Sequence, residues 1–425
     1  MLKIPSANIF RCKMWIRFAA LLISLTVSLP AAASYGEVGN FKYNFSDNGN
    51  CSLAGFASGV TLEESGEINI PATVEYNGKT YTVTAIEDKA FSYRITYECT
   101  LSIPSTVTSI GTDAFYNCWG LVGSLTIPES VTSIGKHAFY NCGFTGVLTL
   151  SKSITTIADG TFQGCSKFSG SLILPENITS IGAASFDGCN GLTGSLIIPN
   201  TVTSIGGSAF KDCSGFTGAL SIPSSVTSIG TYAFQYCSGF SGTLTLPENL
   251  ISIGAYAFSG CSGLTGALIL PKSLTSIEKY AFDGCKNFSG SLAIPESISS
   301  IGEYAFFGCS NLTGTLILPK SLTIIEAGAF SGCSGLTGCL NIPENTTSIG
   351  MYAFSECSGL TGVLTIPESV STIGRNAFSN CSGFSSLVLP ESITSIADET
   401  FYMCKGFSGL LSLPEAVTTI KSCSC

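Results

Sequence analysis

One repeat decides what this chain can fold into. Phe recurs with a period of 24, shortened twice to 23, in fourteen successive units. These positions are Phe91, Phe115, Phe139, Phe162, Phe186, Phe210, Phe234, Phe258, Phe282, Phe306, Phe330, Phe354, Phe378 and Phe401. Cys follows at the third position after Phe in thirteen units, and Pro recurs on the same period. Such periods are typical of solenoids, in which each coil buries its apolar face against its neighbours.

The unit that begins at Leu196 shows how one coil is expected to fold. Leu196 and Ile198 alternate with an outward residue, which predicts a short strand. Pro199 ends that strand because it has no N–H to donate to a ladder. Val202 and Ile205 then predict a second extended stretch. Each coil therefore contributes two short strands that stack in parallel on those of its neighbours.

The segment 209–213, of the form A-F-x-x-C, predicts a brief helical turn with Phe and Cys on the same side. Fourteen such coils, about 4.8 Å apart, would form a rod or arc about 60 to 70 Å long. The expected fold is a solenoid, mainly short parallel β-strands with brief helical turns.

Units of the form I-P-x-S-V-T-S-I-G-x-x-A-F-x-x-C-S-G-L-T resemble the BspA-type leucine-rich repeat. The resemblance covers roughly residues 67–421, and the lead-in segments 66–71 and 76–86 also resemble the opening of bacterial members. It implies a leucine-rich-repeat solenoid of the kind found on surface and secreted proteins, and a role in adhesion or host interaction. The motif is structural, so it carries over no binding residue.

Residues 1–33 have the pattern of a signal peptide. Four basic residues precede an apolar run over 18–29, which ends in Pro and three Ala at 31–33. The run is shorter than the stretch of about 20 apolar residues that spans a membrane. We therefore expect an exported protein whose mature chain has no transmembrane span.

Residues 34–85 are expected to form an N-terminal cap, because Asn77-Gly78 between two β-rich stretches predicts a hairpin. Residues 86–425 form the expected solenoid of about 14 units, incomplete at its C-terminal end. After 418–420 the next A-F-x-x-C turn is missing, and no polar exit cap follows. Truncation, a disrupted reading frame or end-to-end self-association would each account for this.

The thirteen repeat cysteines are expected to point inward beside Phe, where Cys behaves as a small hydrophobic residue. Packed free thiols are the favoured interpretation, and disulfides between neighbouring coils are the alternative in an exported protein. The ladder has no C-x-x-C pair and no nearby His, so we expect no metal. Cys423 and Cys425 are expected to be exposed and able to cross-link two chains.

Charge and composition argue against a nucleic-acid-binding protein and against an enzyme. Only 11% of residues are charged, and removal of residues 1–33 leaves 15 basic and 28 acidic residues, a net charge of −13. That balance disfavours a basic nucleic-acid surface. His137 is the single His and occupies a variable slot before Ala-Phe, which indicates a surface residue. With no second His, triad or phosphate loop in the sequence, we expect no catalytic residue and no cofactor.

A tyrosine ladder is the most suggestive surface feature. Five Tyr share the slot immediately before Ala-Phe, and the first four lie on consecutive coils: Tyr232, Tyr256, Tyr280, Tyr304 and Tyr352. Their rings are expected about 5 Å apart along one outer edge. Aligned exposed aromatics stack on sugar faces or anchor a protein partner. The alternative is that neighbouring rings only stabilise one another.

Two further ladders are expected to serve the fold. After Pro, residues of alternating charge predict ion pairs between adjacent coils: Glu248, Lys272, Glu296, Lys320 and Glu344. If the first strand lines a concave face, that face is small, flat and nearly uncharged, and it lacks Arg, Trp and Tyr. Its residues are Ser102, Thr126, Thr149, Ile173, Ile197, Ser221, Thr245, Ile269, Ala293, Ile317, Asn341, Thr365, Val388 and Ser412.

These patterns favour an adhesin-like binding protein, secreted or at the cell surface, rather than an enzyme. The expected partner is a host extracellular or cell-surface protein, or a neighbouring cell. A carbohydrate-binding module that uses the tyrosine edge is the first alternative, and a structural spacer without a specific ligand is the second.

Overall fold

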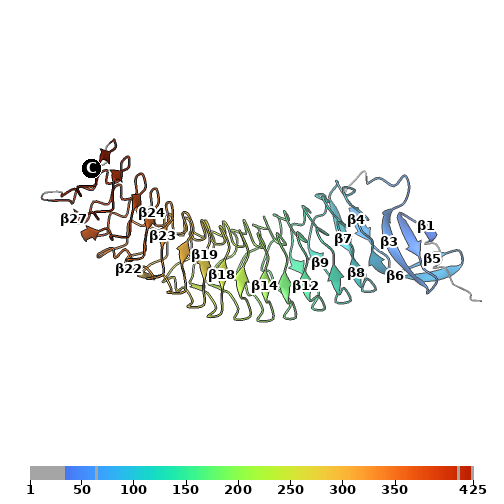
Figure 1. The fold of residues 1–425 in the computed structure, drawn as a ribbon. Helices are drawn as coiled ribbons and strands as arrows, with labels where there is room; N and C mark the ends of the chain where they lie inside the picture. The colour runs from blue at the N-terminus through green and yellow to red at the C-terminus, as the bar shows by residue number, and fades with distance from the viewer. Residues whose placement is uncertain (1–33, 63–65, 409–411, 423–425) are drawn as a thin grey trace, which may run out of the picture. The chain divides into compact units, whose positions relative to one another are not determined.

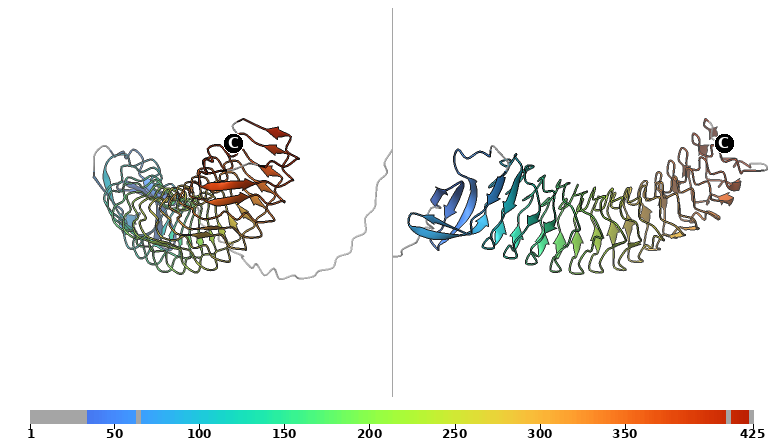
Figure 2. Two further views of the ribbon diagram at one scale, coloured as in Figure 1. Left: turned by 90° about the vertical axis from the view of Figure 1, so that its left-hand side faces the viewer. Right: turned by 180° about the vertical axis from the view of Figure 1, so that it is seen from behind.

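The structure is a computed structural model that describes residues 34–62, 66–408 and 412–422. Residues Ser34–Cys425 form one compact unit. Within it, successive coils are stacked in chain order (Figure 1), and the same order is seen from behind (Figure 2). The predicted signal peptide and the two terminal cysteines lie outside the described residues. The predicted parallel solenoid is confirmed.

The stack begins with strands that precede the regular repeats. β1, β2 and β3 pair antiparallel in that order, and β3 then pairs parallel with β6. β5 and β6 form an antiparallel hairpin in which Asn77 and Gly78 both have positive φ, as a two-residue turn of this kind requires. The six strands are β1 (Ser34–Val38), β2 (Phe41–Phe45), β3 (Asn50–Phe56), β4 (Gly66–Asn69), β5 (Thr73–Tyr76) and β6 (Lys79–Ile86).

The coils contribute two rows of short strands. The first row, before each Pro, consists of β7 (Cys99–Ser102), β9 (Leu125–Thr126), β11 (Leu148–Thr149), β15 (Leu220–Ser221), β17 (Leu244–Thr245), β20 (Leu292–Ala293), β22 (Leu316–Ile317), β25 (Gly362–Thr365) and β27 (Phe384–Val388). The second row consists of β8 (Ser109–Ile110), β10 (Ser133–Ile134), β12 (Thr156–Ile157), β13 (Ser180–Ile181), β14 (Ser204–Ile205), β16 (Ser228–Ile229), β18 (Ser252–Ile253), β19 (Ser276–Ile277), β21 (Ser300–Ile301), β23 (Ile324–Ile325), β24 (Ser348–Ile349), β26 (Thr372–Ile373), β28 (Ser395–Ile396) and β29 (Thr419–Ile420).

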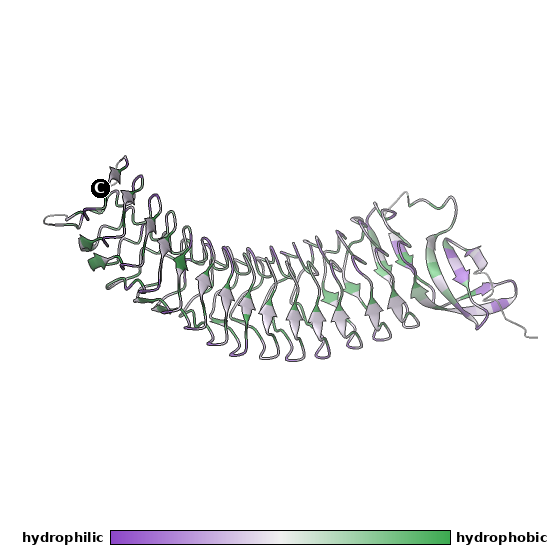
Figure 3. Ribbon diagram, in the orientation of Figure 1, coloured by the Kyte–Doolittle hydropathy of each residue, from purple (hydrophilic) through white to green (hydrophobic). Residues whose placement is uncertain are grey.

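The second row is the more continuous of the two. The second-row strands from β12 to β26 form one parallel sheet of ten strands. Equivalent Ile residues, such as Ile205 and Ile229, lie opposite each other in it. The first row instead breaks into separate pairs, including β9–β11 and β15–β17. Most second-row strands look pale in Figure 3, and in every strand of this row except β23 a Ser or Thr precedes the Ile. One row therefore holds the coils in register along most of the stack.

The core follows the repeat. All fourteen repeat Phe are buried, and each ring stacks on the next with centroids 5.1 to 5.8 Å apart. The inward-facing apolar residues of both strand rows, such as Leu220 and Ile205, are buried around this column. One uninterrupted apolar core therefore runs through the stack.

The segment around each Phe differs from the expected helical turn, and the described residues contain no helix. Three overlapping four-residue turns occur instead, closed by hydrogen bonds from Ala233 N to Gly230 O, from Gln235 N to Tyr232 O and from Cys237 N to Phe234 O. Alternate N–H groups, including those of Tyr232 and Phe234, donate to carbonyls of the following coil, both at 2.8 Å. Because the neighbouring coil takes these donors, no bond to the fourth residue back forms and a helix cannot begin.

Candidate binding surface

Four of the five ladder tyrosines form one stack on the outer edge of consecutive coils. The ring centroids of Tyr232 and Tyr256 lie 4.9 Å apart, those of Tyr256 and Tyr280 4.7 Å, and those of Tyr280 and Tyr304 5.0 Å. The interplanar angles are 18°, 5° and 12°. Each ring remains at least partly exposed. The repeat period thus places these side chains as the sequence predicts.

The backbone at the ladder slot has a left-handed conformation. All five tyrosines have φ between 53° and 60°, at the third residue of the first four-residue turn. A type II turn requires positive φ at that residue, which favours Gly or Asn. In other coils the slot indeed holds residues such as Gly160, Gly328 and Asn376. A bulky side chain there costs about 1–2 kcal/mol, so tyrosine occupies the slot against the local backbone preference.

Gly328 ends the stack, and Tyr352 stands apart from it. A Cβ added at Gly328 would collide with carbons of the Tyr304 ring, so that ring covers the glycine. No ring of the described residues stacks on Tyr352. Its N–H donates to the carbonyl of Arg375 on the next coil at 3.0 Å. The sequence therefore placed five tyrosines in one ladder, of which the structure brings four together.

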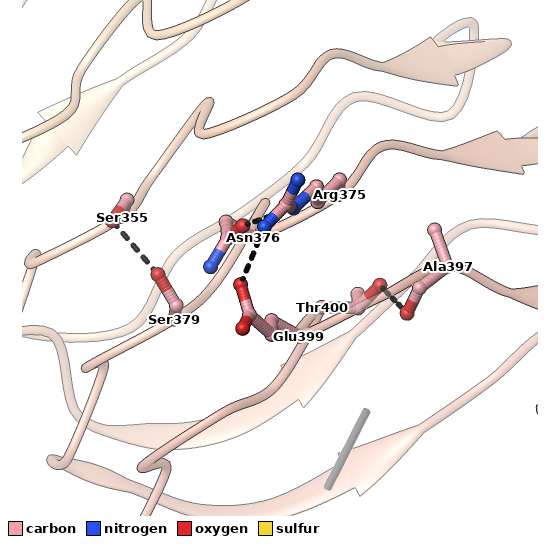
Figure 4. Close-up of polar contacts among 7 residues, drawn as sticks. All are labelled: Ser355, Arg375, Asn376, Ser379, Ala397, Glu399 and Thr400. Atoms are coloured by element: carbon pink, nitrogen blue, oxygen red, sulfur yellow. Dashed lines mark hydrogen bonds and ion pairs between the residues drawn. The ribbon is translucent and has the colours of Figure 1, made fainter. Parts of the chain in front are cut away.

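Polar contacts between coils surround Arg375 (Figure 4). Its guanidinium donates to a carboxylate oxygen of Glu399 at 3.2 Å and to Oδ1 of Asn376 at 3.1 Å. On the buried side, the hydroxyls of Ser355 and Ser379 lie 2.8 Å apart. The charge of Arg375 is thus already compensated by the neighbouring coil.

The stack presents its hydroxyl edges rather than its ring faces. Inner faces are closed, because a sugar ring between two tyrosines would need about 7 Å, twice a carbon–carbon contact of about 3.5 Å. Burial raises the pKa of the Tyr280 hydroxyl, and the neighbouring hydroxyls of Tyr256 and Tyr304 raise it further. The Tyr280 hydroxyl therefore stays protonated at neutral pH and can both donate and accept hydrogen bonds.

The thirteen repeat cysteines are buried and free, which confirms the prediction of packed thiols. Each Sγ lies 2.9 to 3.3 Å from the backbone carbonyl oxygen of the Phe in the preceding coil. Burial raises the pKa of Cys261 and of Cys333 to about 12. Among the described cysteines only Cys339 is exposed. The described residues contain no cluster of His, Cys, Asp or Glu able to hold a metal.

The predicted ladder of ion pairs after Pro is wrong in that form. Among the described residues, none of the five alternating charges forms an ion pair with another. Instead, a carboxylate oxygen of Glu296 accepts the backbone N–H of Lys320 at 2.9 Å. Glu368 accepts the N–H of Glu391 in the same way at 3.2 Å, although that residue is also acidic. Each of these glutamates therefore accepts a backbone N–H of the next coil, so the charge of the residue that donates this N–H does not matter.

The first-row surface is not flat throughout. Ile173 and Ile197 lie on consecutive coils where the first row has no paired strand, and they are 77% and 74% exposed. They line a groove of about 980 Å³ whose wall also includes Ala219 and Pro223. The expected small residues do line the paired strands β9 and β15, where the outward residues are Thr126 and Ser221.

A second aromatic group lies on the first coils. It was not predicted from the sequence, because only the tyrosines directly before Ala-Phe were considered. Tyr116 and Tyr140 occupy the position directly after Phe, and their rings stack at 4.5 Å with an angle of 7°. Tyr93 lies 5.4 Å from Tyr116, and His137 lies 5.9 Å from Tyr140. The spacing of one repeat between Tyr116 and Tyr140 was visible in the sequence and indicated this stack.

Comparison with known proteins identifies the repeat. The model of the BspA type leucine-rich repeat region matches residues 84–217, 217–337 and 337–425. The chain belongs to the BspA-type leucine-rich-repeat family. No match was found among curated proteins. The described residues contain no helix that is both long and apolar enough to cross a membrane.

Two solved structures of bacterial leucine-rich proteins are similar over most of their length. A leucine-rich cell surface protein of Faecalibacterium prausnitzii A2-165 is 27% identical, with a TM-score of 0.58 over 84% of this chain and 95% of that one. A leucine-rich repeat protein of Bacteroides ovatus ATCC 8483 is 26% identical, with a TM-score of 0.62 over 87% of this chain and 92% of that one. Both share the solenoid fold with this chain.

Proposed function

We propose that this BspA-type protein is exported and binds other proteins at the cell surface or outside the cell. Support comes from the pattern of residues 1–33 and from the family. The similar Faecalibacterium prausnitzii chain, a leucine-rich cell surface protein, supports the same location. The partner is an extracellular or cell-surface protein of a host or of a neighbouring cell, and the role is adhesive.

The observation that carries this proposal is the tyrosine stack in left-handed backbone positions. Other coils hold different residues at this slot, such as Ser208 and Gly328 on the two coils that flank the stack, so the fold does not need tyrosine there. Unfavourable backbone conformations persist where the surroundings or a function maintain them. Tyrosine is among the residues that supply most binding energy at protein interfaces, since its ring is large and its hydroxyl forms hydrogen bonds. Four such residues make one contact strip.

A protein partner fits this strip better than a sugar stacked on ring faces, because the inner faces are closed. Backbone and side-chain polar groups of a protein can instead meet the row of hydroxyls, while its apolar groups pack on the ring edges. A glycan that hydrogen-bonds the hydroxyl edges is the second candidate. Removal of the hydroxyls alone separates the two, because a glycan depends on them more heavily than an interface that buries the rings.

The test measures saturable binding of residues 34–425 to immobilised extracellular-matrix proteins and to mucin glycans. The main variant replaces Tyr232, Tyr256, Tyr280 and Tyr304 with Asn, which accepts the left-handed backbone. A second variant replaces the same four with Phe, and Tyr352→Asn is the matched single control outside the stack. Circular dichroism checks that each variant is folded.

We expect the Asn variant to lose at least tenfold in affinity, because interface tyrosines commonly contribute about 2 kcal/mol or more when central. The Phe variant should keep most protein binding, and Tyr352→Asn should keep all of it. Glycan binding that vanishes in the Phe variant would favour the second candidate. Unchanged binding in the folded Asn variant would remove the strip from the interface, and the absence of any saturable binding would favour a spacer.

A further inference from the structure

The aromatic group on the first coils differs from the tyrosine stack in its surroundings. We define it as the N-terminal aromatic cluster, composed of Tyr93, Tyr116, Tyr140 and His137. The His137 ring stands perpendicular to the rings of Tyr116 and Tyr140, at 89° and 83°. Tyr93 tilts by 56° against Tyr116 and is 63% exposed. The cluster thus offers an open ring at its edge rather than a closed stack.

The carboxylate of Asp113 adjoins these rings and, among the described residues, forms no ion pair with a lysine or an arginine. Within the described chain, the only ion-pair contact of Asp113 is His137, whose Nδ1 lies 3.7 Å from Oδ1. The neighbouring cation, Lys136, is held by Asp159 at 2.8 Å and so does not compensate Asp113. The cluster therefore combines ring faces with a carboxylate that no described lysine or arginine pairs with.

The same coils carry two further exposed aromatic residues. Tyr97 and Trp119 are both exposed, and Trp119 follows Tyr116 closely on the same coil. The only arginine in this part of the chain, Arg94, donates to the carbonyl of Val60 at 3.3 Å. Aromatic faces attract cations, and guanidinium groups stack on them most readily. Both features select a positively charged side chain of a partner.

We propose that the N-terminal aromatic cluster with Asp113 is a contact site for an arginine side chain of a basic protein partner. The guanidinium stacks on the exposed face of Tyr93 and pairs with the carboxylate of Asp113. The net charge of −13 expected for the chain after residue 33 favours approach of a basic segment. This inference rests on the proposed protein-binding function but uses a different surface from the tyrosine stack.

A second site in the same chain lacks one of the two features and serves as a matched control. Tyr236 occupies the position equivalent to Tyr93, at the second position after Phe, with φ of 58° against 59°. It is 52% exposed. The carboxylate of Asp212, which lies at the same position on the preceding coil, is 3.4 Å from the ammonium of Lys211 and is therefore already paired. Tyr236 thus has the exposed ring without the free carboxylate.

The experiment titrates residues 34–425 with an arginine-rich synthetic peptide at low and at moderate salt. A peptide of the same length with every arginine replaced by citrulline keeps the shape of the side chain without its charge. The test variant combines Tyr93→Asn with Asp113→Asn, and the control variant combines Tyr236→Asn with Asp212→Asn. The Asn replacements suit the left-handed φ at Tyr93, Asp113, Tyr236 and Asp212 alike. Circular dichroism verifies folding.

We expect the test variant to bind the arginine peptide about fivefold to thirtyfold more weakly, as loss of one cation–π contact and one ion pair implies. The control variant and the tyrosine-stack variant should bind it as the parent does, and the citrulline peptide should bind poorly. Equal loss in both double variants, equal binding of both peptides, or no binding of the arginine peptide at low salt would each overturn the assignment. None of these results depends on matrix-protein binding, which tests the proposed function separately.

Discussion

Two aromatic ladders share the period of the repeat, one inside the solenoid and one on its edge. The buried ladder has Phe in all fourteen coils, with centroids 5.1 to 5.8 Å apart. The exposed ladder has tyrosine on four consecutive coils at 4.7 to 5.0 Å and stops at a glycine. The difference shows that every coil keeps Phe at the core slot, whereas the fold accepts Gly, Ala, Asn, His or Tyr at the outer one. Variation at the outer slot is therefore free to serve recognition.

The buried cysteine thiols should cause the chain to unfold at alkaline pH, and this is the largest effect that we expect. Burial raises the pKa of twelve described thiols above the ordinary value of 9.0. Above pH 9 the unfolded chain releases these protons while the folded chain keeps them. Stability is therefore complete below pH 9 and falls as pH rises toward 12. Each thiol removes up to about 1.4 kcal/mol per pH unit.

Circular dichroism from pH 7 to 11, with rapid alkylation of released thiols, measures this transition. We expect unfolding within about one to two pH units above 9, since total stabilities are only about 5–15 kcal/mol. Cys339→Ser should leave the midpoint unchanged, because Cys339 is exposed in the folded chain. A chain that stays folded with unreactive thiols at pH 11 would contradict the linkage between the thiol ladder and stability.

Truncation of one side chain in the buried Phe ladder is expected to have the next largest effect on stability. Phe258→Ala removes a ring stacked on both neighbours and should cost about 3–5 kcal/mol. Thermal unfolding followed by circular dichroism gives the shift, and hydrogen exchange shows whether the coils around the substitution open first. Tyr256→Asn, just before it on the outer edge, is the matched comparison. Similar destabilisation by both substitutions would erase the distinction between the two ladders.

The thiol donors within the core are expected to contribute less than the rings. Cys261→Ala removes the thiol donor that lies 3.0 Å from the carbonyl of Phe234, which keeps the N–H of Cys237 at 3.2 Å, and should cost about 0.5–1.5 kcal/mol. Cys261→Ser keeps a donor at that position and should cost less than the Ala variant. Thermal unfolding of both variants measures the difference. If Ala proves as stable as Ser, the cysteines serve only to fill volume.

The repeat predicted the inner ladders well because their cause is periodic. One Phe and one Cys per coil, at equal spacing, have a single way to be buried in a stack, so burial and free thiols followed from the sequence. The prediction of a helical turn was wrong. The A-F-x-x-C pattern fits a helix when the segment is considered alone. The hydrogen bonds from Tyr232 and Phe234 to the next coil override that local preference.

Outer features were less predictable because they depend on backbone geometry and on pairs of neighbours. The five tyrosines gave no sign that their slot has a positive φ, although Gly160 and Gly328 in the same slot indicated it. The ion-pair ladder was wrong, since Glu296 reaches a backbone N–H that no sequence pattern displays. The N-terminal aromatic cluster contains residues from different repeat positions, such as Tyr116 after Phe and His137 before Ala-Phe. Comparison of one repeat position across the coils therefore does not predict it.

The smallest expected effect tests whether stacking alone explains the outer ladder. Tyr256→Asn loses two ring contacts, each contributing about 0.5–1.5 kcal/mol, and relieves a left-handed backbone that costs about 1–2 kcal/mol. These terms nearly cancel, so its thermal midpoint should stay close to that of the parent. Tyr352→Asn loses no ring contact and should raise the midpoint slightly. If instead Tyr256→Asn destabilises strongly, tyrosine is retained for stability and the outer ladder resembles the inner one. A higher midpoint for Tyr352→Asn would show that tyrosine persists there at a cost to stability, as expected of a residue retained for contact with a partner.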